Sequence, residues 1–291
     1  MTFDCQYAAY RDALEAALAR YLDASGAPEP LLGAMRYSLL AGGKRLRPVL
    51  LLAACEMGGG DLEAAMPFAC GLEMIHAYSL IHDDLPAMDN DDLRRGKPTN
   101  HKVFGEGMAV LAGDGLLSLA FAVMLDAAET PAAVDAARQI ARAAGVAGMV
   151  GGQCADIACG AEKRGGADEL MYIHRHKTAG LFTGGVCAGL TLAGAQPILL
   201  EAGAAYAAAL GLAFQIRDDL LDIEGNAAVL GKATGMDASA GKLTWPGLHG
   251  VDAAKKALFE QTEAALAALK PFGERAAFLS ALAERLLLRD R

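Results

Sequence analysis

The chain has 291 residues, of which 54 % are hydrophobic and 21 % charged, so it has ample apolar material for a core and intrinsic disorder is excluded. Its formal charge of −9 is opposite to the basic excess of a general nucleic-acid binder, and we expect no nucleic-acid partner. An anionic substrate remains compatible with this charge, because a local basic cluster or a bound metal ion overrides the average.

The residue patterns along the chain are those of helices. Ala and Leu are abundant, and no stretch alternates β-branched or aromatic residues with polar ones over the length of a strand. Pro28 and Pro30 open one expected helix and Pro48 another, while Asp61 suits the N-cap of a helix that continues to about residue 84. We therefore expect one all-α domain over residues 1–291. The other expected helices are 4–24, 107–129, 131–147, 168–176, 178–194, 198–224, 251–269 and 274–288.

Residues 179–200 carry no charge and are long enough to span a bilayer. The stretch is rich in Gly and Ala and is interrupted by Pro197, and no comparably clear partner span accompanies it. A core helix of a large all-helical domain gives the same signature. We expect such a core helix and no transmembrane segment.

The six cysteines form no CxxC pair and no zinc-binding pattern. They lie in surroundings rich in Ala, Gly and Leu, where a free Cys acts as a small core residue. The first residues have an Asp at position 4 and no basic stretch before an apolar run, unlike a secretory signal. Reduced thiols in a cytoplasmic protein fit these features best.

The first informative segment runs from His82 through Asp83 and Asp84 to Asp89, and is followed by Arg94. The two adjacent aspartates close an apolar helix, and Pro86 disfavours helix at the residue before it. Asp89 can then fold back towards Asp83. Hard divalent cations require several oxygen ligands, and Mg²⁺ usually shares carboxylates with substrate phosphates. The alternative is a solvated, acidic helix end.

The second informative segment carries Asp218, Asp219 and Asp222. Asp218 and Asp222 are four residues apart and share a helical face, with Gln215 one turn earlier on it. Like charges at this spacing repel, and apolar residues surround them in the sequence, so these carboxylates need a cationic partner. Two such clusters facing one another across a cavity can bind Mg²⁺ and a diphosphate leaving group, whose negative charge the metal stabilises.

Compact basic sets supply the cations that an anionic substrate requires. Lys44, Arg45 and Arg47 follow two glycines and precede a helix start, a combination that favours phosphate. No GxxxxGK[ST] loop is present. The remaining basic candidates are Arg94, Arg95, Lys177, Lys232 and Lys242.

Together these motifs resemble the trans-type short-chain polyprenyl diphosphate synthases, especially the bacterial farnesyl diphosphate synthases. The resemblance rests on DDxxxxD at Asp83–Asp89, DDxxD at Asp218–Asp222 and the segment Gly43–Pro48, and it covers nearly the whole chain. It implies an all-helical fold around a deep central cavity, usually in a homodimer. It also implies three Mg²⁺ ions and the head-to-tail joining of isopentenyl diphosphate to an allylic diphosphate.

The resemblance also implies roles for individual residues. It assigns two Mg²⁺ ions to Asp83 and Asp89 and the third to Asp218, with Asp84 and Asp222 in support. The residues matching the isopentenyl diphosphate site are Lys44, Arg47, His76 and Arg95. Those matching contacts to the allylic diphosphate are Arg94, Lys177, Lys232 and Lys242. Thr178 and Gln215 match residues that flank the reacting carbons, and Gln153 and Asp156 match a further segment of less definite role.

Product length is expected to depend on how deep the cavity runs below Asp83. Tyr78 lies five residues before Asp83 on the helix, roughly 7.5 Å down its axis, and Ser79 lies four before. In the family that this chain resembles, an aromatic residue at this position with the Pro86–Ala87 insertion accompanies a fifteen-carbon product. The residues from Asp89 to Glu106 resemble plant-type geranylgeranyl synthases instead. We favour farnesyl diphosphate and keep geranylgeranyl diphosphate as the alternative.

Other classes fit the sequence less well. A class I terpene cyclase would share the first acidic motif but lack the second DDxxD and the Gly43–Pro48 segment. A membrane prenyltransferase would need several spans, and a non-catalytic partner subunit would have lost acidic or basic positions. Two departures from the family pattern remain: Asn90 replaces a frequent Asp, and Trp245 stands where Tyr is common.

Overall fold

A computed structural model describes the chain except residues 163–164, 225–241 and 288–291. The described part is almost entirely helical, as expected, apart from one hairpin of two-residue strands. The elements are α1 (Phe3–Ala24), α2 (Leu31–Leu39), α3 (Leu46–Gly58), α4 (Leu62–Asp83), β1 (Leu93–Arg94), β2 (Lys97–Pro98), α5 (Asn100–Phe104), α6 (Glu106–Asp126), α7 (Pro131–Ala144), α8 (Met149–Glu162), α9 (Ala167–Ile173), a π-helical turn (His174–Thr178), α10 (Ala179–Leu192), α11 (Pro197–Glu224), α14 (Trp245–His249), α15 (Val251–Ala268), a 3₁₀ segment (Lys270–Ala276) and α16 (Ala277–Leu287).

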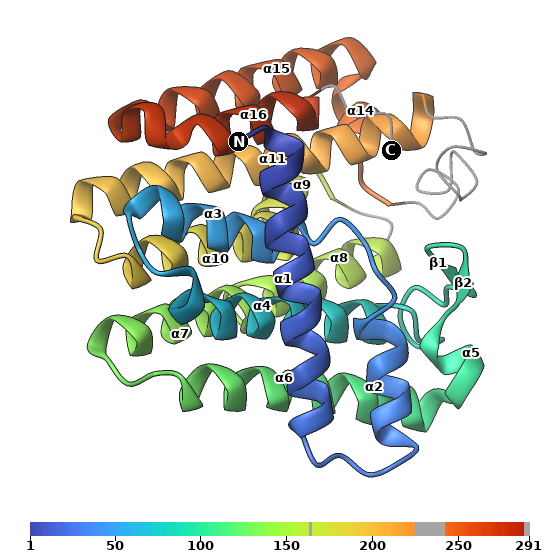
Figure 1. Cartoon of the computed structure of the whole chain (residues 1–291). Coiled ribbons are helices and arrows are strands. Elements are labelled where there is room, and N and C mark those ends of the chain that lie inside the picture. Colours follow the sequence, from blue (N-terminus) through green and yellow to red (C-terminus); the bar gives the residue numbers. More distant parts are fainter. Residues whose placement is uncertain (163–164, 225–241, 288–291) are drawn as a thin grey trace.

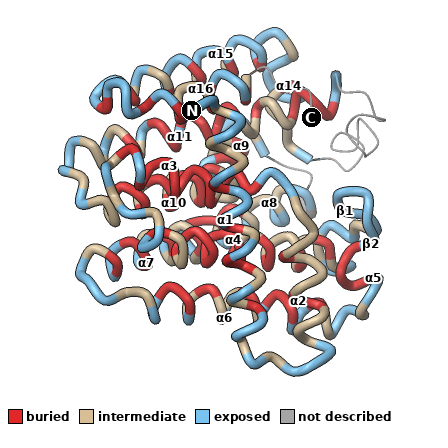
Figure 2. The backbone as a smooth tube through the Cα atoms, in the orientation of Figure 1, coloured by how far each residue is buried: buried red, intermediate tan, exposed pale blue. Residues whose placement is uncertain are grey.

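The helices form stacked layers with α3, α4 and α10 in the middle (Figure 1). Helices α6 and α7 lie along one edge, α11, α15 and α16 lie along the other, and α1 crosses the stack. Buried residues are concentrated in the middle layer (Figure 2). Helix α3 is apolar around most of its circumference, which suits a helix with neighbours on several sides. Of the two helices that carry the acidic motifs, α4 belongs to this layer and α11 packs against α10 in it.

The uncharged stretch at 179–200 is not one continuous helix. Helix α10 ends at Leu192, and α11 begins at Pro197, where proline belongs at a helix start. Helix α10 packs against α3, α7 and α11 as a core helix, as predicted. Its glycines permit this packing: a Cβ at Gly189 would overlap the Leu51 carbonyl oxygen of α3.

Three other helices in the described part are long and apolar enough to cross a membrane, judged by length and composition only: α4, α6 and α11. The buried share of their most apolar windows is 67 %, 39 % and 44 %, respectively. The expected absence of a membrane span therefore stays a prediction.

Most expected helices are present within a few residues of their predicted ends, but several elements were missed. Helix α8 was not predicted, because its glycines lower helical propensity. At Gly152 the glycine is required, since a Cβ there would overlap the backbone of Lys177 in the π-helical turn. The short helices α5 and α14 and the hairpin were also missed. The predicted helix 168–176 is divided between α9 and the π-helical turn, and helix 274–288 begins as a 3₁₀ segment.

Candidate active site

A cavity of about 650 Å³ lies between α4, α8, the π-helical turn and α11, and reaches the start of α3. Residues more than 130 positions apart in the sequence meet here, as Asp83 and Asp218 both line it. Its wall includes most of the predicted site residues: Arg47, His76, Tyr78, Ser79, Asp83, Arg94, Arg95, Lys177, Thr178, Gln215 and Asp218.

The first acidic segment folds as predicted. Helix α4 ends at Asp83, and the chain turns so that the Asp89 backbone N–H donates to the Asp83 carbonyl oxygen at 2.8 Å. Burial raises the pKa of the Asp83 carboxyl to about 6; Lys177 partly offsets this rise, and Asp89 adds to it. A carboxylate under these conditions is stabilised by an additional cation.

Asp84 occupies a different position from Asp83. It is buried, it is absent from the wall of the large cavity, and its Oδ1 accepts from Arg94 Nε at 2.7 Å. Burial raises the pKa of Asp84, and the Arg94 guanidinium partly offsets the rise. Asp84 thus anchors the hairpin that carries Arg94 and Arg95.

The second acidic segment remains helical through Asp222, because α11 continues to Glu224. Asp218 lines the cavity, whereas Asp219 is buried and accepts from the Trp245 backbone N–H at 2.8 Å. Asp222 is buried and is not part of the cavity wall. The anchored Trp245 follows closely after Lys242, whose Nζ lies 3.4 Å from Asp89 Oδ2.

The π-helical turn presents Lys177 and Thr178 to the cavity. π-helical turns are frequent at functional sites. Thr178 Oγ1 donates to Gln215 Oε1 at 2.7 Å, which joins the turn to α11, and Lys177 Nζ lies 2.5 Å from Asp156 Oδ2 on α8. The contact gives Asp156, whose role the sequence left indefinite, a definite position as the partner of Lys177.

Arg47 and His76 meet at one end of the cavity, with Arg47 Nη1 3.2 Å from His76 Nε2. Burial lowers the pKa of Arg47 to about 10, so it stays protonated at neutral pH. Burial and the neighbouring arginines lower the pKa of His76 well below its usual value, so its imidazole is neutral. The buried Nε of Arg47 has no hydrogen-bond partner in the described residues, which leaves a donor for an anionic ligand.

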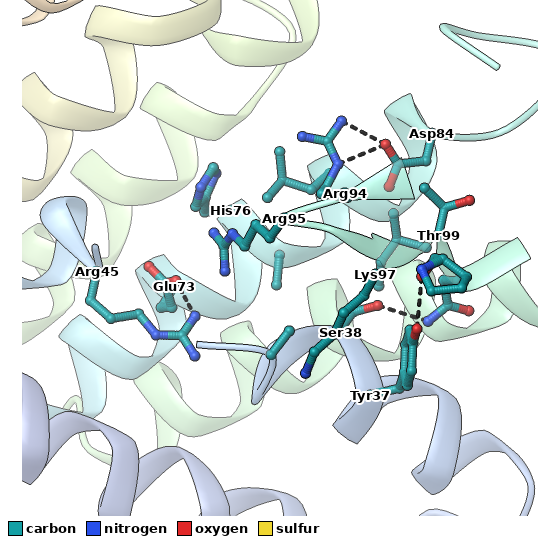
Figure 3. A pocket seen from close by; sticks show the side chains of 16 residues that line it. Tyr37, Ser38, Arg45, Glu73, His76, Asp84, Arg94, Arg95, Lys97 and Thr99 are labelled. Carbon is teal, nitrogen blue, oxygen red and sulfur yellow. Dashed lines mark hydrogen bonds and ion pairs between the residues drawn. The ribbon is translucent and has the colours of Figure 1, made fainter. Parts of the chain in front are cut away.

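A smaller pocket of about 40 Å³ adjoins this end and shares His76, Arg94 and Arg95 with the large cavity. Figure 3 shows Arg95 beside His76, and the Arg45–Glu73 and Arg94–Asp84 ion pairs on either side. The Arg95 guanidinium donates to the Gly42 carbonyl oxygen, next to the predicted phosphate-binding loop. Basic groups from α3, α4 and the hairpin thus converge here.

Arg45, the third cation of the predicted phosphate-binding segment, is paired with carboxylates of the protein. Its backbone is left-handed, with φ of 52°, and its buried guanidinium contacts Glu15 and Glu73, each at 2.7 Å. These contacts direct Arg45 away from the cavity and fix the start of α3, which carries Arg47 into the cavity. A run of basic residues in the sequence gives no sign of which one is structural.

The apolar part of the wall was also missed. It includes Met149, Val150 and Ile157 from α8 and Phe214 from α11. The α8 residues recur at helical spacing together with Gln153 and Cys154, and this periodicity was the signal available in the sequence. Tyr78 is buried in the described structure and Ser79 half-buried, and both lie on the α4 side of the wall.

Five of the predicted positions do not form part of the large cavity's wall in the described structure, and a sixth cannot be placed. Lys44 is exposed on the loop before α3, and Asp89 is exposed beside Lys242. Lys232 lies outside the described residues. The positions not in the wall are Lys44, Asp84, Asp89, Asp222 and Lys242.

The acidic residues fit Mg²⁺ that is shared with a ligand. Among the described residues, no three His, Cys, Asp or Glu side chains are grouped closely enough to hold an ion. Mg²⁺ usually binds through one or two carboxylates and completes its octahedron with water and substrate phosphates. Asp83 and Asp218 line one cavity, and the raised pKa of Asp83 shows a carboxyl that gains from a cation. This donor set therefore suits Mg²⁺ bound together with a diphosphate.

Comparison with known proteins agrees with this geometry. Residues 28–280 match the polyprenyl synthetase family. The chain is 49 % identical over 284 residues to a farnesyl diphosphate synthase of Geobacillus stearothermophilus, covering 96 % of this chain and 95 % of that protein. It is 48 % identical over 267 residues to a chloroplastic geranylgeranyl pyrophosphate synthase of Capsicum annuum, covering 90 % and 72 % of the two chains.

A solved structure of an FPP/GFPP synthase from Zymomonas mobilis superposes with a TM-score of 0.86 at 36 % identity, covering 98 % of each chain. The chain belongs to the polyprenyl synthetase family. The prediction of an all-α fold around a central cavity is therefore confirmed.

Proposed function

We propose that this short-chain prenyltransferase is a farnesyl diphosphate synthase, which condenses isopentenyl diphosphate with dimethylallyl and geranyl diphosphates. The observation that carries the proposal is the cavity of about 650 Å³, with Asp83 and Asp218 on opposite helices and arginines at one end. The similarity to the Geobacillus stearothermophilus farnesyl diphosphate synthase supports the same reaction.

The acidic residues Asp83, Asp89 and Asp218, with Asp84 and Asp222 in support, would hold three Mg²⁺ ions together with the allylic diphosphate. When bound, Mg²⁺ stabilises the negative charge of the departing diphosphate. Lys177 and Arg94, which line the cavity beside Asp83, would bind the same diphosphate. Lys242 and Lys232 complete this proposed set.

The second substrate, isopentenyl diphosphate, would bind at the arginine-rich end. Arg47 offers an unpartnered buried Nε, and the neutral imidazole of His76 lies 3.2 Å from its Nη1. Burial lowers the pKa of Arg47, and the charge of Arg95 is close enough to lower it further. Lys44, on the adjoining loop, would contact the outer phosphate. A guanidinium binds phosphate through two parallel hydrogen bonds, which fixes the orientation of the ligand.

The reaction requires no side-chain nucleophile. The allylic C–O bond breaks, and the diphosphate leaves with the bonding electron pair. The isopentenyl double bond then attacks the allylic carbon, and a proton passes from the new cation to the departed diphosphate. Thr178 and Gln215, joined by a hydrogen bond of 2.7 Å, would flank the reacting carbons, and the apolar wall excludes water from the cation.

Tyr78 and Ser79 are proposed to limit the length of the product. Both line the cavity on α4, and the buried Tyr78 lies five residues before Asp83. The Tyr78 ring at this position is proposed to limit the product to fifteen carbons. Geranylgeranyl diphosphate, the product in the name of the Capsicum annuum relative, remains the alternative.

We further propose a cytoplasmic homodimer in which residues 1–291 form one domain and no segment spans a membrane. The long helix α6 exposes Leu111 at 53 % and Leu125 at 62 %, and it lies along one edge of the stack (Figure 1). A second copy of the chain would cover these apolar side chains. Multi-angle light scattering that gives a monomer mass would contradict the dimer.

A turnover assay on the purified protein tests the proposed function. Isopentenyl diphosphate is supplied with five-, ten- or fifteen-carbon primers, with Mg²⁺ or with EDTA, and the dephosphorylated products are identified by mass. We expect a Mg²⁺-dependent fifteen-carbon product and little use of the fifteen-carbon primer. A twenty-carbon product would support the alternative, and no product from folded protein would refute prenyl transfer.

A further inference from the structure

His82 lies between the proposed cavity floor and the neighbouring helix. It follows Tyr78 by four residues on α4, so the two side chains share a helical face. Their rings meet edge-on, with centroids 5.6 Å apart and planes at 77°. His82 Nε2 lies 3.1 Å from the Val110 carbonyl oxygen of α6. Both rings line the large cavity.

A glycine on α6 makes room for this arrangement. A Cβ built at Gly113 would overlap the His82 imidazole, and the overlap falls on its Nε2, Cδ2 and Cε1 atoms. Gly113 is buried in the middle of α6, where glycine lowers helix stability relative to alanine. The space it leaves is occupied by the ring of His82.

The Tyr78 ring depends on its neighbours for its position. Within the described part of the chain its hydroxyl makes no hydrogen bond, and its ring contact is with His82. A growing prenyl chain would press on this ring, and the His82 ring occupies the space on one side of it. The hydrogen bond to Val110 in turn holds His82 against α6.

We propose that His82 is a positioning residue that holds Tyr78 as the floor of the product cavity, and that Gly113 admits the His82 ring. This inference rests on the proposed function and on Tyr78 as the floor. Product length is then set by side chains from two helices and not by α4 alone. Gly113 contributes by having no side chain, which leaves space for the His82 ring.

Product analysis of four variants tests the inference, with dimethylallyl diphosphate as primer and equal consumption of isopentenyl diphosphate. His82→Ala removes the support of Tyr78, so the ratio of twenty- to fifteen-carbon product rises about two- to tenfold, the range that one edge-on aromatic contact allows. Gly113→Ala displaces His82 towards the cavity, so the ratio of ten- to fifteen-carbon product rises. Tyr78→Ala serves as the reference for an open floor.

Gly107→Ala is the matched control on the same helix, because a Cβ at Gly107 meets no atom within 4 Å. It should leave the product distribution of the parent protein unchanged. Circular dichroism confirms the folding of each variant, and His82→Asn replaces His82→Ala if the latter does not fold. Product distribution is the readout because a purely structural loss would lower the rate without changing the ratios.

The outcomes separate this inference from the proposed function. The parent distribution in either His82→Ala or Gly113→Ala, with a longer product in Tyr78→Ala, would overturn the role of His82 and leave the floor in place. A change in Gly107→Ala as large as that in Gly113→Ala would also overturn it. An unchanged product in Tyr78→Ala would remove the floor itself, and no prenyl product from the parent protein would refute the proposed function.

Discussion

In both acidic motifs one aspartate lines the cavity and its neighbour is bonded to the protein, but the group that bonds this neighbour differs. In each, the first aspartate of the adjacent pair lines the cavity, as Asp83 and Asp218 do, and the second is buried and held by the protein. Asp84 is held by a side chain, the guanidinium of Arg94. Asp219 accepts its shorter hydrogen bond from a main-chain group, the N–H of Trp245 at 2.8 Å, and a longer one from Gln215 Nε2 at 3.4 Å.

This difference shows how each motif organises the segment that follows it. Arg94 lies ten residues after Asp84, so the first contact closes a short loop and positions the hairpin. Trp245 lies 26 residues after Asp219, so the second contact fixes the chain just beyond Lys242. Substitutions of the cavity aspartates should therefore mainly change activity, and substitutions that break an anchoring contact should mainly change stability. A side-chain anchor is lost when its residue is replaced, whereas a main-chain anchor is lost only when the N–H is removed.

The largest expected effect is on the cavity aspartates. Asp83→Asn and Asp218→Asn should each lower kcat/KM by about 10²–10³-fold, the cost of losing one group that stabilises charge in the transition state. Asp83→Asn should also raise the melting temperature measured without Mg²⁺, because burial raises the pKa of Asp83 and its charge is unfavourable at neutral pH. Steady-state kinetics and thermal unfolding by circular dichroism measure the two effects. A fall in the melting temperature would show that Asp83 stabilises the fold, as Asp84 and Asp219 are expected to do.

Next in size is the loss of the side-chain anchor. Arg94→Met leaves Asp84 buried without its guanidinium partner and should lower the free energy of unfolding by about 2–3 kcal/mol. This loss is smaller than the roughly 3–5 kcal/mol of a fully buried pair, because the Arg94 side chain is 33 % exposed and solvent screens the contact. Urea unfolding measures the loss, and Arg138→Met, which breaks an exposed pair on α7, is the control. Equal losses in the two variants would show that Asp84 does not need Arg94.

Much of this site could be predicted from the sequence because its chemistry repeats at fixed spacings. Asp83 and Asp89 meet through a turn that Pro86 makes necessary, and Asp218 shares a helical face with Gln215, so spacing alone placed these side chains together. The role of Arg45 was not accessible in this way, since its direction depends on a left-handed backbone and on Glu15 from α1.

Two further features were hidden for a related reason. Helix α8 contains glycines that lower helical propensity and are explained only by its close contact with the π-helical turn. The contact that ties Asp219 to the segment after Lys242 is the backbone N–H of Trp245, and every residue except proline has such a group, so no residue type marks it. Contacts of main-chain atoms with distant segments depend on the fold, and residue types alone do not predict them.

The second anchor should also respond to pH. His174 lies with its Nε2 3.6 Å from Asp219 Oδ2, and it faces Asp156 from α8. Burial lowers the pKa of His174 to about 4, so the folded protein holds it neutral while the unfolded chain takes up a proton near pH 6.5. Stability from this group is complete above pH 6.5 and is lost as the pH falls towards 4.

Between pH 7 and pH 5 this group should lower the free energy of unfolding by about 2 kcal/mol. His174→Gln removes the titration, so the parent protein should lose that much more stability than the variant over this interval. Urea unfolding at both pH values measures the difference. Parallel pH dependence in the two proteins would contradict a neutral, buried His174.

The smallest expected effect is at Trp245. Its anchoring group is the backbone N–H, and its indole lies near-parallel to the His174 imidazole, with centroids 6.3 Å apart. Trp245→Tyr keeps the N–H and an aromatic ring, so we expect less than about 1 kcal/mol of lost stability and an unchanged kcat. Trp245→Pro removes the donor and should lower both stability and the affinity for the allylic substrate, since Lys242 is no longer held. Equal effects of tyrosine and proline would mean that the indole, and not the main chain, anchors the second motif.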